Sequence, residues 1–197
     1  TNLVALYNIY NLLAAVAAMC ESGIKVEDML PYLETLKQIE GRLERIDEGQ
    51  PFNVFVDFAH TPDGMEKVFE YAKGITPDNC SIIAVFGSAG KRDTKKRKVF
   101  GEIADRYCDS IILTEDDPRD ESAKDIANEI RSGIKNTNSI FIEDRYAAIR
   151  QAIESANVND TVLILGKGDE VFMYREFGRE EWMGDHNVAR HCIRKYT

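Results

Sequence analysis

The first part of the chain carries apolar residues at the spacing i, i+3, i+4 and i+7, which predicts two amphipathic helices. The first stripe consists of Leu12, Ala15, Val16 and Met19, and the second of Met29, Tyr32, Leu33 and Leu36. Gly23 and Gly41 follow the stripes and are expected to lie beyond the helix ends. Two helices of this size bury too little surface for a core of their own. Residues 1–47 are therefore predicted to be the end of a larger domain.

Beyond a turn at residues 48–51, the pattern changes to short strands that alternate with helices. The strand runs cover residues 53–58, 81–86, 109–114, 139–142 and 161–165, and an apolar stripe of helical spacing follows each of the first four. Near-continuous apolar strands are typical of a parallel sheet that helices cover on both faces. Residues 48–197 are therefore predicted to form an α/β domain with a doubly wound, mostly parallel, Rossmann-like sheet.

The pattern weakens after residue 165. Residues 171–174 are predicted as an antiparallel edge strand and residues 186–195 as a final helix, with Asp185 as its candidate N-cap. No internal repeat or low-complexity tract interrupts the chain.

Composition limits the kinds of partner. The 197 residues are 44% hydrophobic and 30% charged, which fits a globular protein, and the formal net charge is −9. This acidic balance argues against nucleic acid as the main ligand, because binding to phosphates needs a basic surface. No apolar run reaches the roughly 18 residues that cross a bilayer, so no membrane partner is expected.

The cysteines indicate the compartment. Cys20, Cys80, Cys108 and Cys192 are scattered, without the CxxC pairs of zinc sites or the density of secreted disulfide scaffolds. They are interpreted as reduced thiols, which predicts a cytoplasmic protein. The chain also begins without Met, close to a helical pattern, so we expect a fragment of a longer protein.

Four polar loops follow predicted strands. They cover residues 57–63, 87–93, 115–119 and 166–170, and they mix cations, carboxylates and glycines. In an open parallel sheet, the carboxyl ends of the strands meet at one edge, where ligands bind. These loops are therefore expected to share one edge, and their composition suits a zwitterion, or a phosphate together with an amino acid.

Each feature also has a structural explanation. Residues 87–90 could form an ordinary strand-to-helix turn, and the cationic run at residues 92–98 could be a solvated helix face. The GKG at residues 166–168 lacks the following Ser or Thr of a phosphate-binding loop. The three histidines, His60, His186 and His191, are interpreted as structural or exposed, and no catalytic triad is legible. These residues alone indicate only an α/β domain with a polar ligand edge.

Six motifs, in order along the chain, resemble those of the Mur ligases, and most closely of the UDP-N-acetylmuramyl-tripeptide synthetases. DFAHTPD at residues 57–63 resembles the DYAHTPD segment of that family. The others are NIYNLLAA at 8–15, GRLER at 41–45, GSAGKRDTKKR at 87–97, DDPR at 116–119 and GKGDE at 166–170. DR at 144–145 with AAI at 147–149 also fits the DRxxAI helix of the family. The chain resembles the C-terminal portion of such a ligase.

The resemblance implies an ATP-dependent ligase of peptidoglycan synthesis. Such enzymes add the third residue to UDP-N-acetylmuramoyl-L-alanyl-D-glutamate through an acyl phosphate. Residues 1–47 then match the end of the central ATP-binding domain, and residues 48–197 match the C-terminal amino-acid-binding domain. The phosphate loop, the Mg²⁺ ligands, a modified lysine and the UDP-binding domain are expected outside this chain. The chain alone is therefore predicted to carry no catalytic or metal-binding residue and to be inactive.

Residue roles follow from the same resemblance. For the nucleotide, Asn8 and Asn11 are expected near the adenine, Arg42 near the terminal phosphate, Asp57 near the ribose and His60 beside the nucleotide. The added amino acid is expected to contact Arg92, Asp116, Asp117, Arg119, Gly166 and Glu170. The two arginines suit the carboxylates of meso-diaminopimelate, and the glutamate suits an ammonium group.

Three departures from the family motifs bear on the substrate. Asp117 stands where the motif has Asn, Asp169 where it has His, and Lys91 where Asp usually precedes Arg92. The added carboxylates, together with WMGDH at residues 182–186, favour L-lysine. The retained arginines and glutamate favour meso-diaminopimelate, which is the preferred prediction.

Two other hypotheses remain. A ligase of the folylpolyglutamate or cyanophycin type shares the closing domain, although its amino-acid loops differ. A non-catalytic binding module that kept the ligand edge would have no phosphate loop upstream of residue 1.

Overall fold

A computed structural model describes residue 3 and residues 5–196, and the chain divides into two compact units, Thr1–Ile39 and Glu40–Thr197. The first unit consists of α1 (Leu6–Glu21) and α2 (Val26–Thr35), as the two apolar stripes predict. Gly23 follows α1 with a φ of +91°, a left-handed conformation that glycine adopts without strain.

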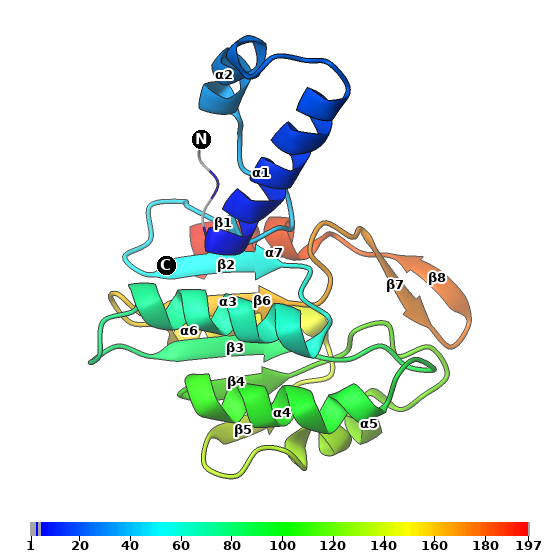
Figure 1. The fold of residues 1–197 in the computed structure, drawn as a ribbon. Helices are drawn as coiled ribbons and strands as arrows, with labels where there is room; N and C mark the ends of the chain where they lie inside the picture. Colours follow the sequence, from blue (N-terminus) through cyan, green and yellow to red (C-terminus); the bar gives the residue numbers. More distant parts are fainter. Residues whose placement is uncertain (1–2, 4, 197) are drawn as a thin grey trace. The chain divides into compact units, whose positions relative to one another are not determined.

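The second unit is built on a six-stranded sheet (Figure 1). In spatial order its strands are β1 (Glu44–Arg45), β2 (Asn53–Asp57), β6 (Thr161–Leu165), β3 (Ile82–Phe86), β4 (Ser110–Leu113) and β5 (Asn138–Phe141). Neighbouring strands are parallel, except β1, which runs antiparallel to β2. The five predicted strand runs are the five parallel strands, so the predicted doubly wound α/β fold is confirmed.

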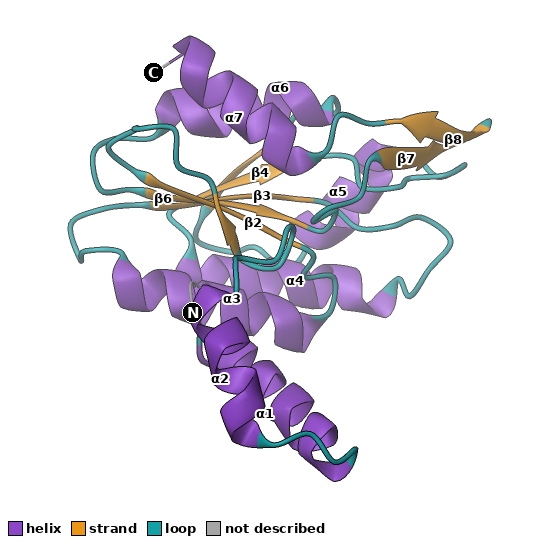
Figure 2. Ribbon diagram, turned by 90° about the horizontal axis from the view of Figure 1, so that it is seen from above, coloured by secondary structure: helices purple, strands orange, loops and turns teal. Residues whose placement is uncertain are grey.

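Helices cover both faces of this sheet (Figure 2). α3 (Pro62–Ile75) and α4 (Lys95–Tyr107) lie on one face, with α5 (Ala123–Arg131) packed beside α4. α6 (Arg145–Ser155) and α7 (Asp185–Tyr196) pack together on the opposite face. Because both faces are covered, β3 and β6 are buried along their whole length. This burial explains why their sequences are continuous apolar runs.

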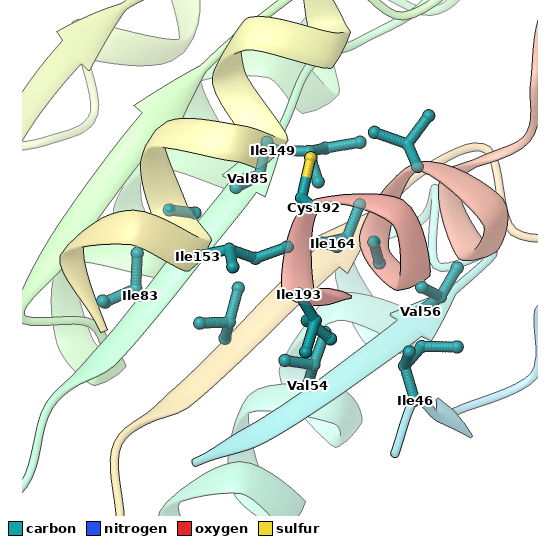
Figure 3. Close-up of a cluster of buried hydrophobic side chains, with 14 of the residues drawn as sticks. Ile46, Val54, Val56, Ile83, Val85, Ile149, Ile153, Ile164, Cys192 and Ile193 are labelled. Atoms are coloured by element: carbon teal, nitrogen blue, oxygen red, sulfur yellow. The ribbon is translucent and has the colours of Figure 1, made fainter. Parts of the chain in front are cut away.

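The face beneath α6 and α7 carries a continuous apolar core (Figure 3). The strands contribute Val54, Val56, Ile83, Val85 and Ile164, and the helices contribute Ile149, Ile153, Cys192 and Ile193. The strand residues alternate because successive side chains of a strand point to opposite faces. None of these side chains is more than 4% exposed.

The topology creates a crevice at the carboxyl ends of the strands. β3 and β6 are neighbours, but the helix after β3 is α4 and the helix after β6 is α7, on the opposite face. Where loops of adjacent strands diverge in this way, ligands bind in the gap between them. The four polar loops predicted from sequence all leave the sheet at this edge.

The prediction that residues 171–174 add an edge strand to the main sheet was wrong. β7 (Phe172–Arg175) pairs instead with β8 (Gly178–Glu181) in a separate antiparallel hairpin. Gly178, with a φ of +115°, lets the chain reverse at once, so β7 pairs with the residues directly after it.

The prediction that Asp185 caps the last helix was also wrong. Asp185 is the first residue of α7 and is fully buried. Its carboxylate accepts hydrogen bonds from Nε and Nη2 of Arg145 at 2.8 and 2.7 Å, and from the indole of Trp182 at 3.2 Å. A buried guanidinium needs a carboxylate partner, and this requirement outweighs helix capping.

The second unit begins at Glu40, before the predicted boundary between residues 47 and 48. β1 pairs with β2, with Glu44 opposite Val56, and Ile46 is fully buried in the core. By packing, residues 40–47 therefore belong to the second unit. Within the described part of the chain, no helix combines the length and apolarity needed to cross a membrane.

Asp105, near the end of α4, provides a test of this fold. Its Oδ1 accepts hydrogen bonds from the backbone N–H groups of Asn136 and Thr137 at 2.9 and 2.7 Å. Burial alone would raise the pKa of Asp105, but the bonds from Thr137, Asn136 and Lys135 outweigh it and lower the pKa from 3.8 to about 2. The carboxylate thus ties α4 to the segment before β5.

We predict that this contribution is lost in acid. Because the folded-state pKa is depressed, the stabilisation is present above the ordinary pKa of 3.8 and disappears as the pH falls towards 2. Its size is about 1–2 kcal/mol after allowance for solvent screening. Urea unfolding at about pH 6 and about pH 2.5 should show a smaller drop for Asp105→Asn than for the wild type. Equal drops would contradict the assignment.

Candidate functional site

A cavity of about 640 Å³ opens at the carboxyl ends of the strands. This volume is within the usual range for small-molecule sites. Loops after β2, β6, β3 and β4 form its walls, and Tyr174 of β7 closes one side. Its polar lining consists of His60, Ser88, Arg92, Asp93, Lys96, Asp116, Asp117, Arg119, Glu170 and Tyr174, and its apolar lining includes Phe58, Met65, Phe86 and Phe100.

The residues predicted for the amino acid lie around this one cavity. Arg92, Arg119 and Glu170 come from three different strand ends, and all three line it. Asp116, Asp117 and Gly166 also belong to its wall. Guanidinium and carboxylate groups can therefore reach the same small ligand.

Arg119 is held in an unusual backbone conformation. Its φ is +55°, and its N–H donates to the carbonyl of Tyr174 at 2.9 Å. Nη1 donates to the carbonyls of Gly90 and Asp117 at 2.8 and 3.3 Å, and the guanidinium lies 5.6 Å from the Tyr174 ring centroid. A positive φ is strained for a residue with a side chain. In this conformation Arg119 bonds both Gly90, in the loop after β3, and Tyr174, in β7.

Two further cations line the wall nearest α4. Arg92 is exposed and makes no hydrogen bond or ion pair within the described chain, so its donors face solvent or a ligand. Lys96 is half-buried, and its Nζ donates to the carbonyl of His60 at 2.9 Å. Burial lowers the pKa of Lys96, while Asp116 and Asp93 act in the opposite direction.

Asp116 is a buried carboxylate in the wall of the cavity. It is 8% exposed, and within the described residues no donor bonds its carboxylate. Burial raises the pKa of Asp116, against the opposing effect of Arg145 and Lys167. Gly166 lies so close that a Cβ there would be 2.3 Å from Oδ2 of Asp116. An ammonium group in the cavity would supply the missing donor.

Asp117 and Glu170 share a buried partner. Nζ of Lys167 donates to Oδ1 of Asp117 at 2.8 Å and to Oε2 of Glu170 at 2.5 Å, and Lys167 itself is fully buried. The N–H of Tyr174 also donates to Oδ1 of Asp117, at 2.9 Å. The carboxylate that replaces the asparagine of the family motif is therefore paired inside the protein.

Arg145 lies beneath the same loops. Besides its bonds to Asp185, its guanidinium donates to the carbonyl of Glu115 at 3.1 Å and to that of Leu165 at 2.9 Å. These carbonyls directly precede Asp116 and Gly166, which both line the cavity. One buried side chain therefore holds the loops after β4 and β6 in position. The DR motif found in the sequence thus has a positioning role.

The residues predicted for the nucleotide divide between the two units. In the second unit, the guanidinium of Arg42 lies 4.7 Å from the ring centroid of Phe58, whose ring is 4.8 Å from that of His60. Arg42 and His60 are exposed, and only His60 lines the cavity. An exposed cation beside aromatic rings fits the phosphates and the base of ATP.

Asp57 is turned towards the backbone. Its Oδ2 accepts from the N–H of Leu43 at 2.6 Å and its Oδ1 from the N–H of Ala59 at 2.7 Å. It therefore orders the loop that carries Arg42. Gly41 in that loop packs so tightly that a Cβ would be 2.2 Å from the amide nitrogen of Asp169. The predicted nucleotide and amino-acid loops are thus in direct backbone contact.

Asn8 and Asn11 lie one turn apart on α1 in the first unit, where Asn8 is buried and Asn11 is exposed. Within the described residues, no group of three His, Cys, Asp or Glu side chains could hold a metal ion.

Sequence reasoning missed three contributors. Lys96 lay in a cationic run that also suited a solvated helix face, yet it lines the cavity, and its neighbour Arg97 is 1% exposed and paired with Glu121 and Glu129. Lys167 was passed over, although a lysine between two glycines directly after a buried strand was a usable signal. Tyr174 lines the cavity from the β7–β8 hairpin, and no local sequence pattern predicted that hairpin.

Comparison with known proteins shows the family to which the chain is related. The profile of the family "Mur ligase, glutamate ligase domain" matches residues 41–168. A UDP-N-acetylmuramyl-tripeptide synthetase of Roseiflexus sp. is 45% identical over 170 residues, which is 83% of this chain and 33% of the relative. A UDP-N-acetylmuramoyl-L-alanyl-D-glutamate–2,6-diaminopimelate ligase of Geobacillus kaustophilus is 40% identical over 198 residues, covering 99% of this chain and 40% of the relative.

A solved structure of a UDP-N-acetylmuramoyl-L-alanyl-D-glutamate–2,6-diaminopimelate ligase superimposes with a TM-score of 0.74 at 31% identity. It matches over 98% of this chain and 39% of its own. The chain thus spans about two fifths, or less, of the length of these relatives. The family profile covers well over half of the residues, in the unit that holds the cavity. The chain therefore belongs to the Mur ligase family, and its second unit is the C-terminal domain of that family.

Proposed function

We propose that this chain is the amino-acid-binding part of an ATP-dependent ligase. The complete protein adds the third residue, meso-diaminopimelate, to UDP-N-acetylmuramoyl-L-alanyl-D-glutamate in peptidoglycan synthesis. One observation carries the proposal: guanidinium and carboxylate groups from separate strand ends line one cavity of suitable size. The names of the relatives support the reaction class.

The charges of the cavity favour a ligand without net charge. Three cationic side chains (Arg92, Lys96 and Arg119) and four carboxylates (Asp93, Asp116, Asp117 and Glu170) line it, and the buried ammonium of Lys167 supplies a fourth positive charge. Meso-diaminopimelate carries two ammonium groups and two carboxylates at neutral pH, whereas lysine has a net positive charge. The balanced cavity therefore suits diaminopimelate better.

The arginines offer the second argument. Arg92 has unused donors, and Arg119 bonds two backbone carbonyls with Nη1, which leaves its other nitrogens for a carboxylate. Guanidinium groups bind carboxylates in a planar, two-bonded geometry. Lysine has only the carboxylate next to its reacting amine and would leave one arginine without a partner.

ATP is the phosphoryl donor of the proposed reaction, and Arg42 and His60 would contact it in this unit. The task of these residues is to hold charge next to the phosphates, while the cavity keeps the incoming amine oriented and away from bulk water. We propose that Asn8 and Asn11 contact the adenine and that the Mg²⁺ ligands lie outside this chain. The chain alone should therefore be inactive.

For the proposed function, the first prediction concerns the substrate. The complete protein should release phosphate from ATP only when the UDP-muramyl dipeptide and an amino acid are both present. Its kcat/KM for meso-diaminopimelate should exceed that for L-lysine by at least about tenfold, because a cationic side chain leaves an arginine unpaired. Phosphate release and product mass measure this across diaminopimelate, lysine and ornithine.

The outcomes separate the alternatives. A preference for lysine would support the lysine-adding hypothesis, and turnover with a folate and glutamate, or with aspartate and arginine, would indicate another ligase type. No turnover with any pair would leave a binding module and defeat the proposal.

The second prediction concerns Arg92. Arg92→Met should raise the KM for meso-diaminopimelate by about 10- to 150-fold, because a charge-assisted hydrogen bond contributes roughly 1.5–3 kcal/mol. The KM for the UDP-muramyl dipeptide should stay constant. Arg106→Met is the matched control, since Arg106 is exposed on α4, pairs with Glu66 and lies outside the cavity. Equal effects of the two variants would remove Arg92 from the site.

A further inference from the structure

We propose that Lys167 determines which amino acid the cavity accepts. It acts as an internal cation that neutralises Asp117 and Glu170, so that the cavity favours a side chain ending in both ammonium and carboxylate over a purely cationic one. This inference rests on the proposed function and names a residue for its specificity.

The geometry of Lys167 is that of a fixed partner. Its side chain is fully buried, and its Nζ is 2.8 Å from Asp117 and 2.5 Å from Glu170. Both carboxylates line the cavity, whereas Lys167 does not. The ammonium group of Lys167 therefore neutralises part of the charge of Asp117 and Glu170 from inside the protein, without lining the cavity itself.

Two glycines flank Lys167 in a closely packed loop. Gly166 and Gly168 flank it with φ values of +112° and +54°. A Cβ at Gly166 would be 2.3 Å from Asp116, and one at Gly168 would be 2.8 Å from Phe58. Glycine at both flanking positions lets the loop pack closely against Asp116 and Phe58, and the side chain of Lys167 between them is fully buried.

The ammonium keeps its charge in this setting. Burial alone would lower the pKa of Lys167, but the hydrogen bonds to Asp117 and Glu170 outweigh it, and the pKa is raised. A charged lysine bonded to two carboxylates leaves their combined excess at one negative charge. Without it, the same wall would present two uncompensated carboxylates.

This internal pairing determines which charged groups a substrate side chain needs in order to pair with the residues of the cavity. A substrate side chain that ends in an ammonium alone would bind Asp116 and the carboxylate oxygen of Glu170 that Lys167 does not bond. It would leave Arg92 or Arg119 without an anionic partner. A side chain with both groups satisfies the two sets together. Asp117 stands where the family motif has asparagine, and its extra negative charge would by itself favour a cationic substrate. Lys167 neutralises this charge and so removes that preference.

The experiment measures the ratio of kcat/KM for meso-diaminopimelate to that for L-lysine in the complete protein. Lys167→Met should lower this ratio about tenfold or more, because it adds one net negative charge to the wall, worth at least 1.4 kcal/mol. Asp117→Asn should raise the ratio, because it removes one negative charge. The double variant, Lys167→Met with Asp117→Asn, should return it towards the wild-type value.

Lys98→Met is the matched control, since Lys98 is an exposed lysine of α4 that pairs with Glu102 and does not line the cavity. Its ratio should equal that of the wild type. If Lys167→Met fails to fold, Asp117→Asn and the double variant still test the opposing shifts.

Unchanged ratios in an active enzyme would overturn the role of Lys167 and leave the proposed function intact. A wild type without turnover on either amino acid would overturn both. A parallel loss of both activities at a constant ratio would show that Lys167 is structural only and would equally overturn the inference.

Discussion

Buried positive charge holds the ligand edge of this domain together. Arg145 and Lys167 are both fully buried, and each joins segments from different strand ends. Arg145 bonds the carbonyls of Glu115 and Leu165, and Lys167 bonds carboxylates that face the cavity. Removal of a partner from such a buried pair costs about 3–5 kcal/mol, since the other charge stays buried and unpaired. The loops can therefore keep their relative positions before any ligand binds.

Close backbone approach is the second condition for the site. A Cβ at Gly90 would be 1.9 Å from the carbonyl oxygen of Pro118, and one at Gly41 would be 2.2 Å from the amide of Asp169. Glycine at these positions lets loops from separate strands touch through their main chains. The side chains between them then converge on one cavity. The same contacts connect the loop of Arg42, proposed for the nucleotide, with the loop proposed for the amino acid.

The fold was accessible from sequence because its strongest signals are local. Short continuous apolar runs such as residues 161–165 favour buried strands, and the helices between the strands show their own spacing directly. The hairpin and the role of Asp185 were not accessible in this way. β7 could pair either with the main sheet or with β8, and it pairs with β8. The carboxylate of Asp185 could cap a helix end or bond the guanidinium of Arg145, and it bonds the guanidinium. The bond of Asp185 depends on Arg145, which is 40 residues away along the chain. The partner of β7 is close in sequence, but β8 consists of the polar residues GREE and carries no apolar pattern.

The sequence by itself determined the order of the five parallel strands and the helices along the chain, the family, and the set of polar loops that share one edge. The tertiary structure decided which charges in those loops line the cavity and which neutralise each other. Asp117 and Asp116 are adjacent in sequence, yet the first is paired with Lys167 and the second has no donor among the described residues. Charge compensation depends on distances of a few ångströms between separate strand ends, and those distances exist only after the sheet has assembled.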